Sequence, residues 1–250
     1  MPKLGLGNVA SSATSMITPG IVTSNLVMKH MYPAGAVQPV SDGACLFDEG
    51  ENEYIAIGNQ SNLSFGTGSF SVACWVNSHQ TGTSSFILGK GSSTSTASSV
   101  GYALYLGNSG TDWVFSVGDG TDYELVETTV AQNANQWYYL CGTFDGSLKQ
   151  LKLYVDGALI ETDADTDIGD IDNSDAFDIG RLDASTGNDW NGYICNVGVW
   201  SAVLTQAQIK SIMWKQHADL STTEKTNLVS FWNLDTDAND SHGSNNGTLT

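Results

Sequence analysis

Residues 136–162, QWYYLCGTFDGSLKQLKLYVDGALIET, decide the fold. Their first part, Trp137–Phe144, is an aromatic and apolar run that is rich in strand formers and too short for a typical helix. Apolar residues then recur at period two from Leu151 to Val155, as in a half-buried strand. The dipeptide Asp156-Gly157 predicts a type I′ hairpin, because both residues tolerate a positive φ. We therefore expect three antiparallel strands that need a second sheet to cover their apolar face.

Short strand-like runs separated by Gly, Asn, Asp and Ser fill much of the remaining chain. Many short strands with regular turn signals are typical of a β-sandwich or barrel. We expect strands at Ala44–Phe47, Tyr54–Ile57, Phe70–Val76, Ser85–Leu88, Tyr102–Leu106, Trp113–Val117, Tyr123–Thr129, Phe177–Ile179 and Tyr193–Trp200, with two similar strands near the chain ends at Asn25–His30 and Asn227–Trp232.

Two short helices are expected near the carboxyl end. Thr205 and Gln208 have the spacing of a capping box, and apolar residues follow in a stripe that ends at Met213. Ser221 and Glu224 repeat the capping pattern and predict a second, shorter helix. Both helices are interpreted as packing elements.

The composition excludes several classes of partner. Against 9 Lys and Arg the chain has 27 Asp and Glu, and Arg181 is its only arginine, so the net charge is −18. This charge repels phosphate backbones and anionic membrane surfaces, so we expect neither nucleic acid nor membrane as a partner. The acidity favours solubility, and divalent-cation binding is the alternative.

The domain organisation is predicted from local composition. Residues 1–24 are small and polar without a period, and form either a free terminus or an arm that orders against a partner subunit. Residues 25–250 form one domain with a core at 40–215 and a returning strand at 226–250. The amino terminus shows no apolar core of signal-peptide length, so we expect synthesis in the cytosol. No apolar window is long enough to cross a bilayer.

Four cysteines lie far apart, each inside an apolar strand-like run, and none has the spacing of a zinc site. Free buried thiols are the favoured interpretation and two disulfides the alternative. The residues are Cys45, Cys74, Cys141 and Cys195.

An ordered series of motifs resembles a concanavalin A-like jelly roll of the laminin G type. The motifs are FSVACWVN at 70–77, WYYLCGTFDG at 137–146, LYVDG at 153–157, IGR at 179–181 and NGYICNVGVW at 191–200. The resemblance implies an all-β fold of two stacked antiparallel sheets with six or seven strands each. Function does not follow from this fold, because one jelly roll hosts lectins, glucanases, adhesins and structural modules. The polar arm and the lack of an export signal are also similar to jelly rolls in virion proteins of tailed phages.

No catalytic constellation is found. The glucanase branch of the fold uses a strand of alternating carboxylates, and Glu124 and Glu127, three apart, would point to opposite faces of a strand. Nucleophile-elbow, zinc-protease and phosphate-loop motifs are missing. The histidines, which we expect at the surface or in packing, are His30, His79, His217 and His242. We therefore predict a protein that is not an enzyme.

Two candidate ligand sites are predicted. Alternating carboxylates in a loop suit Ca²⁺, although the EF-hand register fails, and a solvated acidic loop is the alternative. This calcium set is Asp163, Asp165, Asp167, Asp170 and Asp172, with Asp175 close by. We expect that the protein requires no cofactor, and calcium is the one candidate. A glycan site with exposed rings and polar end loops is predicted at Asn188, Asp189, Trp190 and Trp113, with core packing as the alternative for Trp190.

The favoured interpretation is a structural or decoration protein of a larger assembly, specifically a phage virion. Residues 1–24 would attach it to other virion proteins, and the jelly roll would be displayed on the virion surface, where it contacts host glycans. The alternative is a carbohydrate-binding adhesin or lectin module, extracellular or at a cell surface, with calcium as a candidate requirement. Oligomers are compatible with both.

Overall fold

The structure is a computed structural model that describes residues 43–91, 98–107, 110–128, 132–164, 167–182 and 188–250. The predicted arm at 1–24 and the strand at Asn25–His30 lie outside the described residues.

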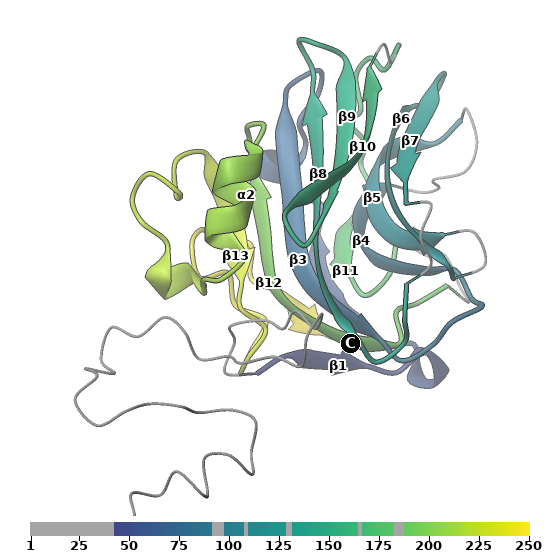
Figure 1. Ribbon diagram of the computed structural model, residues 1–250, viewed down its shortest axis with the longest axis vertical. Helices are drawn as coiled ribbons and strands as arrows, with labels where there is room; N and C mark the ends of the chain where they lie inside the picture. Colours follow the sequence, from purple (N-terminus) through teal and green to yellow (C-terminus); the bar gives the residue numbers. More distant parts are fainter. Residues whose placement is uncertain (1–42, 92–97, 108–109, 129–131, 165–166, 183–187) are drawn as a thin grey trace, which may run out of the picture.

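Two antiparallel sheets of seven strands each stack face to face (Figure 1). This architecture confirms the predicted all-β jelly-roll sandwich. Sheet A has the order β1 (Cys45–Phe47), β12 (Gly192–Trp200), β3 (Phe70–Ser78), β8 (Trp137–Asp145), β9 (Gln150–Val155) and β10 (Ala158–Ala164), and β13 (Leu228–Trp232) also pairs with β12. Sheet B has the order β14 (Thr248–Leu249), β2 (Ile55–Gly58), β11 (Phe177–Ile179), β4 (Ser85–Gly91), β5 (Val100–Gly107), β6 (Asp112–Asp119) and β7 (Tyr123–Glu127).

The predicted meander is β8–β9–β10, and its second turn has the predicted geometry. Asp156 has a φ of 50° and Gly157 a φ of 74°, as a type I′ turn requires. The Asp156 carboxylate also accepts a hydrogen bond from the Tyr139 backbone N–H at 2.9 Å. The turn residue therefore holds the start of β8 as well as the hairpin itself.

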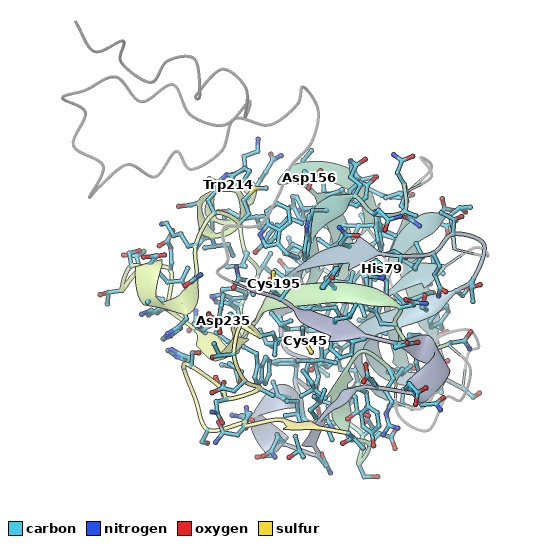
Figure 2. The ribbon with its side chains drawn as sticks, turned by 90° about the horizontal axis from the view of Figure 1, so that it is seen from below. Cys45, His79, Asp156, Cys195, Trp214 and Asp235 are labelled. Atoms are coloured by element: carbon cyan, nitrogen blue, oxygen red, sulfur yellow. The ribbon has the colours of Figure 1, made fainter. Side chains whose placement is uncertain are left out.

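Alternate side chains of β3 point into two different hydrophobic cores, one on each face of sheet A. Phe70 and Val72 point between the sheets, into the larger core. Trp75 points to the opposite face of sheet A, where α2 (Gln206–Ile212) covers it, and its indole N–H donates to the Met213 carbonyl at 2.8 Å. Figure 2 labels Trp214, which packs on this second core. Sheet A is therefore covered on both faces.

The first predicted helix is confirmed and the second is wrong. Thr205 and Gln208 form both bonds of a capping box at the start of α2. Ser221 and Glu224 also bond to each other, but residues 222–227 are turns that follow a 3-10 turn at His217–Asp219. The chain must enter β13 at Leu228, which leaves too few residues for a helix.

None of the four cysteines forms a disulfide in the structure, and three of them are buried. Burial raises the pKa of the Cys74 thiol well above its usual value. Cys74, Cys141 and Cys195 therefore serve as small core residues. Among the described residues, no helix has the length and apolar character that spanning a bilayer requires.

The two sheets are in close contact at Gly142 in β8. A Cβ atom placed on Gly142 would lie 2.3 Å from the Phe115 ring of β6. Gly142→Ala is therefore expected to lower the free energy of unfolding by about 1–3 kcal/mol through overpacking. Urea denaturation measures the loss, and Gly50→Ala is the control expected to change little, because Gly50 is exposed and an added Cβ would meet only the exposed Asp48 carboxylate, at 3.2 Å. Equal stability of the two variants would contradict this account of the core.

Candidate functional site

Three aromatic side chains form a row on the outer face of sheet B. The rings of Phe86 in β4 and Tyr105 in β5 lie 5.3 Å apart between centroids. The hydroxyl of Tyr105 lies 3.0 Å from that of Tyr123 in β7. All three side chains are half-buried, so part of each ring is accessible. We call Phe86, Tyr105 and Tyr123 the aromatic row.

Strand periodicity places this row outside the core. Leu104 and Leu106 of β5 point into the large core, so Tyr105 between them points outward. Phe86 pairs with Tyr105, and the register shifts before Leu88, which pairs with Leu104. This irregularity keeps Phe86 on the outer face beside Tyr105 while Leu88 enters the core.

The row combines apolar and hydrogen-bonding surface. Aromatic faces stack on the apolar faces of sugar rings, and phenol hydroxyls donate and accept hydrogen bonds. Burial raises the pKa of Tyr123 above its usual value, so this phenol keeps its proton at neutral pH. The arrangement suits a neutral, polyhydroxylated ligand.

Residues with amide side chains follow in the segments that contact β4. The Phe86 backbone N–H donates to the Asn188 carbonyl at 2.8 Å, so the loop at 188–191 runs along β4. In the same region the Gln80 side-chain oxygen accepts from Asn191 at 3.4 Å, and the Gln80 carbonyl accepts from Gln132 at 3.0 Å. We call Gln80, Asn188 and Asn191 the amide rim, and Gln132, which is 5% exposed, is buried behind it.

The predicted glycan residues are only partly in this region. Trp190 and Trp113 are 0% and 1% exposed, lie in the large core and have ring centroids 6.3 Å apart. Neither ring can stack on a sugar, so the predicted stacking role is wrong for both, and the core alternative holds for Trp190. Asp189 is buried as well, whereas Asn188 belongs to the amide rim.

Sequence reasoning missed the aromatic row, although a usable signal was present. The run Tyr102–Leu106 alternates, and Tyr105 falls on the face opposite its leucines. What the sequence did not supply is the pairing that places Phe86 and Tyr123 on the same face.

A second aromatic group lies on the outer face of sheet A. The Tyr193 ring lies 6.0 Å from Trp137 and 5.0 Å from His79 between centroids. Much of this face is already covered by α2 and the second core. The aromatic row on sheet B is therefore the stronger candidate, and Tyr193 provides a matched control for it.

Within the described residues, the calcium set is spread over β10 and the loop that follows it. Asp163 lies in β10 beside Glu124 of β7, and burial together with this neighbour raises the pKa of Glu124. Asp165 lies outside the described residues. Asp172 accepts a hydrogen bond from the Gly66 N–H at 2.7 Å, and Asp170 accepts one from the Asp172 N–H at 3.0 Å.

Across the described part of the chain, no three His, Cys, Asp or Glu side chains gather as a metal site would require. Asp167 is exposed, like Asp170 and Asp172. Calcium binding stays a prediction of the sequence.

Calorimetric titration tests the calcium prediction directly. If the loop binds calcium, metal-stripped protein gives heat that disappears in the double variant Asp170→Asn, Asp172→Asn, because the hard cation loses its carboxylate ligands. If the wild-type protein gives no heat of binding at millimolar calcium, the prediction is refuted.

Cations of sheet B are engaged in internal contacts. The Lys90 side chain, in a residue only 1% exposed, donates to the Asn59 side-chain oxygen at 2.9 Å and to the Asp175 carbonyl at 2.6 Å. Arg181 forms an ion pair with Asp178 at 2.7 Å and lies 3.2 Å from the centre of the Tyr54 ring. Lys90 and Arg181 therefore hold loops onto the sheet through these contacts.

Lys90→Met is expected to lower the free energy of unfolding by about 1–3 kcal/mol, because buried oxygens lose their donor. Urea denaturation measures the change, and Lys210→Met, at an exposed lysine of α2, is the control. If Lys90→Met is as stable as Lys210→Met, the Lys90 ammonium group makes no net contribution to the free energy of unfolding.

A surface pocket of about 260 Å³ opens where β1, β2 and β14 meet. Cys45 and Asp235, both labelled in Figure 2, contribute to its lining. Burial and the nearby Glu53 raise the pKa of the Cys45 thiol to about 11, so it is protonated at neutral pH and a weak nucleophile.

Sequence comparison establishes the family. Residues 49–210 match the model of the concanavalin A-like lectin/glucanases superfamily, which is more than half of the chain. The chain belongs to this superfamily. Comparison with curated proteins gives no match.

Solved structures share the fold at low identity. A candidate carbohydrate-binding protein from Bacteroides ovatus has a TM-score of 0.67 and 22% identity, over 85% of this chain and 59% of that protein. This chain therefore spans less than two thirds of that protein.

Two smaller modules are also similar. The CBM40 domain of the Ruminococcus gnavus IT-sialidase, bound to α2,3-sialyllactose, has a TM-score of 0.56 and 14% identity, over 68% of this chain and 96% of that one. Domain 4 of a GH43 extracellular arabinanase from Geobacillus stearothermophilus, in complex with arabinotriose, has a TM-score of 0.54 and 16% identity. The match covers 68% of this chain and 76% of that one.

Proposed function

We propose that this chain is a carbohydrate-binding module and that its glycan lies on the aromatic row of sheet B. The observation that carries the proposal is the juxtaposition of Phe86, Tyr105 and Tyr123 on one outer face, beside the amide rim. Accessible rings bind the apolar faces of sugars, and neighbouring amides and phenols bind their hydroxyls. Similar solved modules with bound sialyllactose and arabinotriose support this proposal at the level of the fold.

The proposed ligands are neutral glycans. Recognition of a sugar carboxylate favours a bidentate arginine, and the only arginine of the chain, Arg181, is paired with Asp178 and stacked on Tyr54. Glu127 of β7 adds negative charge on the strand that carries Tyr123. With a net charge of −18, the protein repels acidic sugars.

Binding is tested by calorimetry with a neutral oligosaccharide, chosen from a glycan array, and with sialyllactose. Tyr105→Ala is expected to weaken neutral-glycan binding about tenfold, because a stacking ring and a phenol hydroxyl are worth about 1–2 kcal/mol. Tyr193→Ala, on the opposite sheet, is expected to bind like the wild-type protein.

The opposite pattern, with loss in Tyr193→Ala and none in Tyr105→Ala, would move the site to sheet A. An array without any hit would remove the proposed function. Stronger binding of sialyllactose than of neutral sugars would overturn the proposed selectivity.

The proposed module acts by binding alone. On sheet B the aromatic row supplies rings and hydroxyls, and the amide rim supplies amide groups. These groups are suited to binding a ligand. Incubation with neutral polysaccharides should release no reducing sugar, and release would contradict this part of the proposal. The attachment of residues 1–24 to a virion stays a prediction, since those residues lie outside the described part.

A further inference from the structure

Two histidines from separate segments face each other on the surface beside β13. His217 begins the 3-10 turn His217–Asp219, and His242 lies in the loop between β13 and β14. The Nε2 atom of His217 lies 3.3 Å from the Nδ1 atom of His242. Their ring centroids are 5.5 Å apart, with the planes inclined at 63°. His217 is half-buried and His242 is exposed, so the pair is open to solvent.

The backbone fixes both histidines in this arrangement. The His217 N–H donates to the Asn233 side-chain oxygen at 3.2 Å, and its ring lies 5.8 Å from that of Phe231. One carboxylate oxygen of Asp240 accepts from both the Phe231 and the His242 N–H groups at 3.0 Å. The loop that carries His242 is thereby tied to the same strand against which His217 packs. Such support is what holds paired ligands at a fixed separation.

The distance between the two nitrogens is that of a chelating pair. Two imidazole nitrogens that each lie about 2.0–2.1 Å from one tetrahedral ion are separated by about 3.4 Å. We propose that His217 and His242 chelate one divalent transition-metal ion of the zinc, nickel or copper class. Imidazole nitrogen suits these ions and not the hard calcium ion.

The proton balance permits this binding. In the neutral pair one ring donates its N–H to the other, and that ring can carry its proton on the far nitrogen instead, so both facing lone pairs become available. Burial, Lys225 and His242 lower the pKa of His217, against an opposing effect of Asp240, which favours the neutral ligand form. Since no cluster of three or more protein ligands occurs among the described residues, water completes the coordination shell.

The chelate would join two parts of the chain. An ion held by both rings links the 3-10 turn before β13 to the loop after it, so it stabilises the carboxyl-terminal segment. Zinc is therefore expected to raise the melting temperature of the full chain.

Calorimetry with zinc chloride tests the proposal on the full chain. The wild-type protein is expected to bind one high-affinity zinc per chain, and His242→Gln to weaken that binding by about tenfold or more and to cancel the rise in melting temperature. His79→Gln is the control, since His79 is exposed and remote from the pair. Calcium chloride is the control for adventitious binding to the acidic surface.

Each outcome decides the matter. His242 is exposed, so an unchanged metal-free melting temperature shows that His242→Gln folds normally. Zinc binding that is weaker than wild type in His242→Gln, and equal to wild type in His79→Gln, supports the chelate. Equal zinc affinity in the wild-type and His242→Gln proteins, or no heat from the wild-type protein at millimolar zinc, overturns it. A second variant, His217→Gln, should reproduce the loss.

Discussion

Close contact between the two sheets is the constraint on which the rest of the structure depends. The Phe115 ring of β6 lies where a side chain of Gly142 would otherwise stand, so the sheets meet without a gap at this point. Large side chains such as Phe70 and Phe144 fill the surrounding interior. With the space between the sheets filled, a ligand must bind on an outer face or at an end of the sandwich.

The filled interior gives each strand position one of two roles. On β5 the leucines enter the core and Tyr105 remains outside, where it meets Phe86 and Tyr123. On sheet A the outer face is largely occupied by α2 and the residues that pack beneath it, Trp75 among them. The outer face of sheet B presents the rings and hydroxyls of the aromatic row, which is why we propose that sugars bind there.

The charges of the protein also restrict the ligands that it can bind. Lys90 and Arg181 use their charge to hold loops of sheet B in place, and the acidic side chains outnumber the basic ones threefold, 27 against 9. Neutral sugars and metal cations are the partners that such a surface tolerates. The histidine pair His217–His242 concentrates nitrogen ligands at one point of it.

The sequence by itself determined the elements that depend on local chemistry. The strand runs from Ala44 onward, the Asp156-Gly157 turn and the Thr205 capping box follow from periodicity and turn residues within a few positions, and the described part of the structure contains them. Tertiary structure decided whatever depends on sheet register and on chain segments far apart. Only the stacking of the sheets decides between the two predicted roles of Trp190, a binding-loop ring and a core residue, in favour of the core. Only strand pairing and loop packing assemble the aromatic row and the histidine pair. These contacts join distant positions, so no local pattern encodes them.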